Sequence, residues 1–316
     1  MECIDAHRKK IVRYFEEPFN GGTKFRNGDT LFARITPCLE NGKTSLVDIL
    51  SYDEIGFGST EFIVFRGIED ITTNEFVYYV TISDEFRENA ISSMTGTTGR
   101  QRVQINLLKE KTVFVPSIRI QNKIVSILKP LDDKIETNIN NMTYLEEIIN
   151  AIYNDWFNNF NCPGVVFKHK EEIPFNWENS NAYDNVIEVS ERNTDNLDYP
   201  VLSVVKEGKF KLSEDVFTKQ VYSKNTTNYK IVRRNQVAYN PARANIGSIA
   251  MLTEFDAGLV SPIYVVFEMK ETITPTFFKY YMKQPEFLEN IKHHAIGTTR
   301  QNLPFEAFKM FNMVVP

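Results

Sequence analysis

The strongest constraint on the fold of this chain is that its sequence repeats. One stretch, from Gly96, reads G-T-T-G-R-Q-R-V-Q-I-N-L-L-K-E-K-T-V-F-V-P, and another, from Gly297, reads G-T-T-R-Q-N-L-P-F-E-A-F-K-M-F-N-M-V-V-P. Further matches lie upstream at offsets of about 200 to 207: E-F-R-E-N with E-F-L-E-N, Y-Y with Y-Y, S-T-E-F-I-V-F with S-P-I-Y-V-V-F, and G-D-T-L-F-A-R with N-Q-V-A-Y-N-P-A-R. Because these matches keep one order, the sequence predicts two copies of one domain.

The repeat also sets the expected domain boundaries. We expect a first domain at residues 1–116, a spacer at residues 117–160 and a second domain at residues 161–316. By the offset, Met1 corresponds to about position 207, so some 45 residues at the start of the second copy have no counterpart in the first. The first domain is therefore expected to lack its N-terminal part.

The spacer has the pattern of a helix. Its apolar residues recur at steps of three and four, which is typical of a helical stripe close to a coiled-coil seam. The expected seam residues are Ile124, Leu131, Ile135, Met142, Leu145 and Ile149. Ser117 is a plausible N-cap.

Pro130 should kink or break this helix near Lys129. We expect a short helix at Ile118–Leu128 and a long one at Leu131–Phe157, reaching on the order of 40 Å. By the repeat, a second spacer helix would follow Pro316, where the chain stops. The apolar stripe then lacks a partner, so we expect self-association through it.

Each copy mixes helical and strand-like segments. Residues 28–36, 61–66, 165–167 and 261–267 are rich in β-branched and aromatic residues and predict strands. Residues 76–90 and 276–292 predict helices. The expected fold class is α+β, with two repeated mixed α/β domains joined by a long coiled-coil-like helix.

Composition excludes some classes of protein. An apolar share of 42% and a charged share of 24% are typical of a soluble globular chain, and no stretch is apolar for the ~18–20 residues of a membrane helix. The N-terminus has no signal-peptide pattern, and three dispersed cysteines predict a reducing cytoplasm. The net charge of −5 argues against a simple basic DNA-coating protein, although residues 206–243 carry nine basic side chains against three acidic ones. That run is either a solvated face or a phosphate-binding surface.

No catalytic or metal-binding motif emerges. Gly42-Lys43-Thr44 lacks the glycine that a phosphate-binding loop needs five positions earlier, where Pro37 stands. Asn240-Pro241 is followed by alanine and arginine rather than by the proline and aromatic residue of amino-methyltransferases. The four histidines have no metal-ligand spacing with cysteines or acids. An enzyme in its own right is therefore the weakest hypothesis.

Two longer stretches resemble a known family. Residues 28–43 with 56–66, and the run from Gly99 to Asn138, resemble the target-recognition domain and its junction with the spacer helix in specificity subunits of type I restriction-modification systems. The resemblance covers essentially the whole chain, which differs in lacking the opening of the first domain and the last helix.

The resemblance implies a role in recognition rather than catalysis. It implies two recognition domains that each read one half of a split sequence in double-stranded DNA, with helices fixing the gap. It also implies no cofactor in this chain. The partners that the resemblance implies are modification subunits, which methylate adenine with S-adenosylmethionine, and through them a restriction subunit driven by ATP with Mg.

The repeated loop supplies the first candidate DNA-binding residues. Glycine lets a backbone approach closely, threonine can donate to phosphate, and arginine and glutamine can reach base edges. The candidates are Thr97, Thr98, Arg100, Gln101 and Arg102 in the first copy, and Thr298, Thr299, Arg300, Gln301 and Asn302 in the second. The alternative is a structural turn that packs onto the spacer helix.

Further candidates lie in loops after strands and in the basic run. They are Arg34 and Lys43 in the first copy, Asn240, Arg243 and Asn245 in the second, and Lys224, Lys230, Arg233 and Arg234 as phosphate contacts. The alternative for these residues is an ordinary surface ion pair.

Two functions therefore remain open. The first is a sequence-specific reader that directs methyltransferase and restriction subunits to DNA. The alternative is a truncated scaffold that binds partner subunits through its helix without reading DNA.

Overall fold

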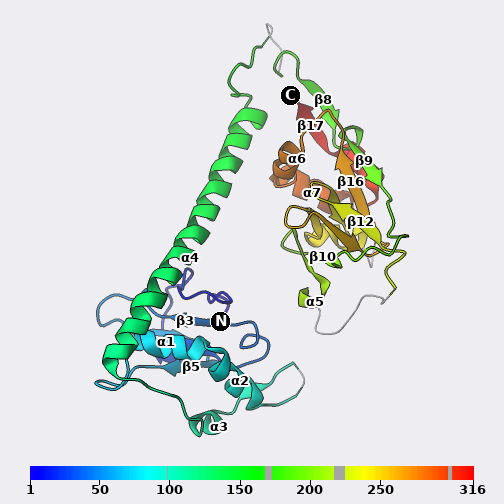
Figure 1. Cartoon of the computed structure of the whole chain (residues 1–316). Helices are drawn as coiled ribbons and strands as arrows, with labels where there is room; N and C mark the ends of the chain where they lie inside the picture. The colour runs from blue at the N-terminus through cyan, green and yellow to red at the C-terminus, as the bar shows by residue number, and fades with distance from the viewer. Residues whose placement is uncertain (98, 168–172, 217–224, 298–300) are drawn as a thin grey trace. The chain divides into compact units, whose positions relative to one another are not determined.

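The computed structural model describes residues 1–97, 99–167, 173–216, 225–297 and 301–316. The chain divides into two compact units, Met1–Leu145 and Glu146–Pro316. The division falls within one long helix, α4 (Ile118–Tyr153), which contributes to both units (Figure 1). The expected boundaries at residues 116 and 160 stay a prediction.

Unit 1 is a small α+β domain. Its strands are β1 (Thr23–Phe25), β2 (Thr30–Ala33), β3 (Thr44–Leu46), β4 (Gly56–Gly58), β5 (Phe62–Phe65), β6 (Met94–Thr95) and β7 (Arg102–Val103), and its short helices are α1 (Asn74–Ile82), α2 (Asp84–Ser92) and α3 (Ile105–Lys109). The main sheet has the antiparallel order β3-β2-β5, beside the ribbons β1-β4 and β6-β7. Phe32 of β2, which is fully buried, packs edge-on against Phe65 and Phe86 and so joins the sheet to α2.

Unit 2 is larger. Its strands are β8 (Glu178–Asn181), β9 (Val186–Val189), β10 (Leu202–Val205), β11 (Lys209–Leu212), β12 (Lys230–Arg233), β13 (Val237–Tyr239), β14 (Ile249–Met251), β15 (Ala257–Val260), β16 (Val265–Met269) and β17 (Asn312–Val315). Its helices are α5 (Ser213–Val216), α6 (Pro275–Tyr281) and α7 (Pro285–His294), with π-helix η1 (Asn154–Asn158) and 3-10 helices η2 (Tyr183–Asn185), η3 (Pro241–Ile246) and η4 (Phe305–Met310). The main sheet has the order β14-β13-β16-β9.

The two units share one strand order. The sheet β3-β2-β5 of unit 1 matches β14-β13-β16 of unit 2, and the ribbon β1-β4 matches β12-β15. The aromatic cluster matches too, since Tyr239 and Phe267 pack together at the positions that Phe32 and Phe65 occupy in unit 1. The repeat read from the sequence is thus a repeat of topology.

Four expected elements differ from the structure. Residues 76–90 form two helices, because Ser83 is extended between them and its hydroxyl accepts from the N–H of Phe86. Residues 276–292 likewise divide into α6 and α7, where Pro285 begins a new helix. Residues 165–167 form no strand: Val166 and Phe167 are exposed, so the β-propensity of this stretch is not supported by packing. Of residues 261–267, only the last three belong to a strand.

The expected break at Pro130 was wrong. The helix α4 runs through this proline from Ile118 to Tyr153. Proline in a helix interior costs roughly 3 kcal/mol, but α4 is fastened to unit 1 on both sides of it. The buried amide of Gln121 accepts from the N–H of Thr73 and donates to two carbonyls, while Asp132 accepts from the Tyr79 hydroxyl at 2.6 Å. These contacts offset the local cost.

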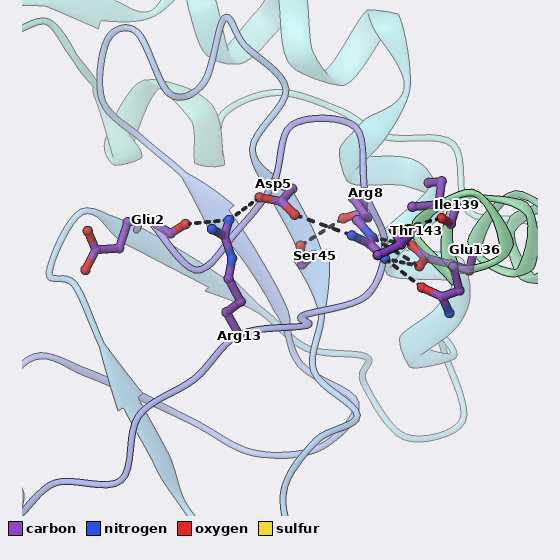
Figure 2. A network of polar contacts seen from close by, with 9 residues as sticks. Glu2, Asp5, Arg8, Arg13, Ser45, Glu136, Ile139 and Thr143 are labelled. Carbon is purple, nitrogen blue, oxygen red and sulfur yellow. Dashed lines mark hydrogen bonds and ion pairs between the residues drawn. The ribbon is translucent and has the colours of Figure 1, made fainter. Parts of the chain in front are cut away.

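Figure 2 shows how α4 docks on the N-terminal segment of unit 1. Arg8 donates to both carboxylate oxygens of Glu136, at 2.9 to 3.1 Å, and its own carbonyl accepts from the hydroxyl of Ser45 in β3. Glu136 is almost fully buried, so its charge is balanced where water is largely excluded. The pKa of Arg8 is raised, chiefly by this hydrogen bond.

Among the described residues, no helix is both long and apolar enough to cross a membrane.

Candidate nucleic-acid interface

The repeated glycine motif forms a hairpin loop in unit 1. Strands β6 and β7 pair Met94 with Val103 and Thr95 with Arg102, and the loop between them begins at Gly96. Gly96 has φ of 131°, and a Cβ at this position would lie 3.0 Å from the carbonyl oxygen of Arg100. The hairpin therefore needs glycine both for its backbone angle and for its tight closure.

The matching hairpin of unit 2 is closed in the same way. Ile296 and Asn302 exchange two backbone hydrogen bonds at 2.9 and 2.8 Å, and Gly297 has φ of 138°. A glycine with positive φ thus stands at the same repeat position in both units, beside a backbone pairing that closes each segment.

Each hairpin is tied to the loop that follows the central strand. In unit 1 the N–H of Val103 donates to the carbonyl of Arg34 at 2.9 Å, and in unit 2 the N–H of Leu303 donates to the carbonyl of Pro241 at 3.0 Å. In unit 1 the N–H of Thr36 also donates to the carbonyl of Gln101. Thus the candidate DNA-binding residues of the hairpin and those of the loop after the central strand, which are far apart in sequence, lie together in each unit.

In unit 1 the positive charges of two candidate arginines are balanced by one carboxylate. Arg102 donates to both carboxylate oxygens of Glu61 at 2.7 to 3.0 Å, and the Nε of Arg34 lies 3.9 Å from the same carboxylate. The Arg102 hydrogen bond holds the pKa of Glu61 below its usual range. Arg100, by contrast, is exposed and makes no side-chain hydrogen bond or ion pair with any residue that the structure describes. Thr97 is exposed as well, and Gln101 is half-buried.

Lys43 is half-buried and donates to the carbonyl of Met1 at 3.2 Å. It is therefore fixed against the N-terminal segment, whereas Arg100 remains the free cation of this hairpin among the described residues.

In unit 2 the loop after β13 is the helix η3. The side chain of Asn240 caps it by accepting from the N–H of Ala242, and Asn245 donates to the side-chain oxygen of Gln301 at 2.7 Å. This amide contact joins η3 to the hairpin. Arg243 is exposed, and within the described part of the chain its guanidinium has no hydrogen-bond or ion-pair partner. Arg243 and Asn240 line a surface hollow together with Ser203 of β10.

Three of the nine basic residues in the run at residues 206–243 are paired with acids from outside it. Lys230 is buried and lies 3.8 Å from Glu188, Arg233 makes two hydrogen bonds to Glu191, and Arg234 makes one to Asp256. The local charge excess counted along the sequence is therefore reduced on the folded surface.

Some candidates lie outside the described residues. These are Thr98, Lys224, Thr298, Thr299 and Arg300.

The expected seam on α4 is an open apolar stripe. Leu131, Ile135, Met142, Leu145 and Ile149 have exposed fractions between 37% and 68%, and Ile124 is half-buried. Counted from Ile124 to Ile152 the stripe follows a heptad rhythm in which only Asn138 is polar.

The sequence reasoning missed a second stripe, on α4 and η1, whose first residues contact the rest of unit 1 and whose last residues contact the rest of unit 2. It consists of Asp132, Glu136, Glu146, Tyr153 and Phe157, which recur at helical spacing about 100° around the helix from the seam. Glu146 pairs with Lys283, an ion pair that lowers the pKa of Glu146, and the buried ring of Tyr153 lies 5.4 Å from that of Phe277. The mixture of acids and aromatics hid this stripe from a search for apolar periodicity.

Within the described residues, no group of three or more His, Cys, Asp or Glu side chains could hold a metal ion. The chemistry available at both hairpins is that of hydrogen-bond donors and acceptors and of free guanidinium groups.

Comparisons with known proteins find similarity to one group of proteins. The family described as "Type I restriction modification DNA specificity domain" matches residues 8–143, which is nearly all of unit 1. The specificity subunit of the type I restriction enzyme EcoAI from Escherichia coli is 25% identical over 210 residues, covering 65% of this chain and 34% of that protein. The HindI specificity subunit from Haemophilus influenzae is 31% identical over 138 residues, covering 43% of this chain and 29% of that protein.

A solved structure shares the fold. The type I restriction-modification S subunit from M. genitalium superposes with a TM-score of 0.51 at 13% identity, covering 99% of this chain and 79% of that one. The chain spans about a third of the length of the curated relatives it matches. Residues 8–143 of the chain are thus similar to the DNA specificity domain of type I restriction-modification systems, and the chain is similar to specificity subunits of type I restriction enzymes.

Proposed function

We propose that this chain is a non-catalytic DNA reader that binds a split site in double-stranded DNA, with one half of the site for each unit. The observation that carries the proposal is the pair of matching hairpins. In both units a positive-φ glycine begins the hairpin, the hairpin is tied to the loop after the central strand, and an unpaired arginine lies in one of the two joined segments.

Each part of this arrangement suits a DNA contact. Backbone held close to a surface can approach phosphates, and arginine, glutamine and asparagine can make bidentate contacts with base edges. We assign Arg100 and Gln101 to base contacts in unit 1, and Arg243, Asn245 and Gln301 in unit 2. The ion-paired Arg34 and Arg102 orient the loop of unit 1, and they reach DNA only if Glu61 releases them.

We further propose that the exposed seam of α4 is the partner surface. An apolar heptad stripe left in water favours pairing with another helix. The partner is a helix of a modification subunit or of a second copy of this chain. The methyl donor S-adenosylmethionine, and ATP with Mg, would be bound by partner subunits rather than by this chain.

A scaffold without DNA reading is the second candidate. Two observations favour it: Lys230, Arg233 and Arg234 of the basic run are paired with acids, and the seam is the most extensive exposed apolar stripe on α4. The two candidates differ in whether the hairpin arginines affect DNA affinity.

Replacing the unpaired arginines by uncharged glutamine separates the two candidate functions. Arg100→Gln and Arg243→Gln should each weaken binding to duplex DNA by about 5- to 150-fold, because a good base contact is worth roughly 1–3 kcal/mol. Binding is measured by fluorescence anisotropy at fixed salt, with circular dichroism to check the fold.

Lys109→Gln provides a charge-matched control, since this exposed lysine lies in α3, directly after the hairpin. The account expects less than a twofold change for this variant. Equal small losses for all three variants would favour the scaffold.

A further inference from the structure

A row of four residues crosses each hairpin and the loop tied to it. In unit 1 the pairing of β2 with β5 continues by one residue, where the N–H of Arg34 donates to the carbonyl of Glu61 at 3.0 Å. The N–H of Val103 ties the hairpin to Arg34, and Arg102, directly before it, pairs with Thr95 across the hairpin. The row of unit 1 therefore consists of Glu61, Arg34, Arg102 and Thr95.

Unit 2 has the same row with different side chains. The pairing of β13 with β16, continued by two residues, brings Pro241 opposite Ile263. The N–H of Leu303 ties the hairpin to Pro241, and Asn302, directly before it, pairs with Ile296. In the order used for unit 1, the row of unit 2 consists of Ile263, Pro241, Asn302 and Ile296.

The turns before β5 and β16 show independently that Glu61 and Ile263 are counterparts. In unit 1 the residue after Glu61 donates from its N–H to the carbonyl of Ser59 at 3.2 Å. In unit 2 the residue after Ile263 donates in the same way to the carbonyl of Ser261 at 3.0 Å. Glu61 and Ile263 therefore occupy the same position in the same turn.

The two rows differ in their chemistry. In unit 1 three of the four side chains are charged, and both arginines lie against the carboxylate of Glu61. In unit 2 three of the four are apolar and the fourth is an amide. Ile263 is 61% exposed and Ile296 is 72% exposed, and Ile246 of the adjoining helix η3 is 53% exposed. Apolar side chains gathered on an exposed surface mark a place of contact with another molecule.

A T·A pair offers both partners that the row of unit 2 can contact. In the major groove adenine presents N7 and its N6 amino group, which an asparagine amide can contact with two hydrogen bonds. Thymine presents a methyl group, which apolar side chains contact, whereas a G·C pair presents none. The amide of Asn302 between two isoleucines therefore suits a T·A pair better than a G·C pair.

We infer that unit 2 reads at least one T·A pair in the major groove through the thymine methyl group, which Ile263 and Ile296 contact. This assignment rests on the proposed function, because it specifies the base chemistry of the half-site that unit 2 reads. Arg243 lies outside the row and contacts a neighbouring base. Unit 1 carries Glu61 and Thr95 at the two isoleucine positions, so the two units present different chemistry to their half-sites.

Replacing thymine by uracil tests the inference, because deoxyuridine keeps the base pair and lacks only the methyl group. The probe is the duplex motif that the full chain, with type I modification subunits, selects from a random pool. Uracil is placed at the thymines of one half at a time, and affinity is measured by fluorescence anisotropy at fixed salt. In the half that Arg243→Gln loses, uracil should weaken binding about fourfold for each contacted methyl, as expected for one buried group of this size.

Substitution of the isoleucines shows whether they make the contact. The double variant Ile263→Ala, Ile296→Ala should bind the thymine duplex about as weakly as the wild-type chain binds the uracil duplex, and it should no longer distinguish the two. Ile187→Ala is the matched control, because Ile187 is 52% exposed in the same unit but lies on β9, outside the row. This control should keep the full difference between thymine and uracil. Circular dichroism checks that each variant is folded.

The outcomes separate the inference from the proposed function. Equal affinity of the wild-type chain for the thymine duplex and for both uracil duplexes would overturn the inference alone, as would a motif whose unit 2 half specifies no T·A pair. An undiminished difference between thymine and uracil in the double variant would also overturn it, because other residues would then contact the methyl group. A pool without any enriched motif would contradict the proposed function and the inference together.

Discussion

At the scale of single residues, the glycine that begins each hairpin carries the most information. Gly96 and Gly297 have φ of 131° and 138°, in a region that other residues avoid. In the proposed function, substitutions at Arg100, Gln101 or Arg243 change base contacts without altering this backbone. The hairpin is therefore a fixed frame that can present changeable side chains.

Gly96→Ala should distort the hairpin of unit 1. The new Cβ meets the Arg100 carbonyl oxygen at 3.0 Å and forces an unfavourable φ, at a cost of roughly 1–3 kcal/mol. We expect DNA affinity to fall about as far as in Arg100→Gln, with a modest fall in melting temperature. Gly99→Ala serves as a partial control, because its φ is also positive but no atom lies within 4 Å of a Cβ there. Equal affinities for the two variants would contradict a steric role for Gly96.

At the scale of elements, the apolar periodicity of α4 predicts the helix but not the polar contacts that hold it in place. The 3–4 spacing of Leu131, Ile135 and Met142 predicts the helix and its seam, and the structure confirms the helix. The same spacing says nothing of Asp132 and Glu136, which hold α4 to unit 1 through Tyr79 and Arg8. Polar docking contacts depend on partners far away in sequence, and no local pattern encodes them.

The errors at Pro130 and at residues 165–167 have the same origin. Local propensity favoured a helix break at Pro130 and a strand at residues 165–167, but tertiary contacts decide the secondary structure at both places. The anchored flanks of Pro130 keep it helical, and Val166 and Phe167 find no sheet to join. By contrast, the strands β2 and β5 were predictable because their residues face a core.

Substitutions on the two stripes of α4 should behave differently. Met142→Glu on the exposed seam should leave unit stability nearly unchanged, since its side chain is 68% exposed, while reducing association with a partner helix or a second copy. Tyr153→Ala on the docking stripe should destabilise unit 2 by roughly 3–5 kcal/mol, because a buried aromatic ring leaves a cavity.

Thermal unfolding and light scattering at micromolar concentration measure the two effects. A purely monomeric wild-type chain that also fails to bind modification subunits would contradict the seam as a partner surface.

At the scale of the whole molecule, duplication explains most of the architecture. The order of strands in both sheets, the aromatic cluster at Phe32 and Tyr239, and the hairpin ties at Val103 and Leu303 all occur twice. The repeat, and with it the fold class, could be read from the sequence. The pairing of Arg34 and Arg102 with Glu61, and of Arg233 with Glu191, could not, because charge counts along a chain do not show which charges meet.

Selection of DNA from a random duplex pool tests the central claim most directly. The purified chain is incubated with the pool in moderate salt, with and without type I modification subunits, and the retained DNA is sequenced. The account predicts enrichment of a split motif with two short specified halves, and loss of one half in Arg100→Gln and of the other in Arg243→Gln. Retained DNA with no enriched motif, in the presence of the modification subunits, would contradict DNA reading by this chain.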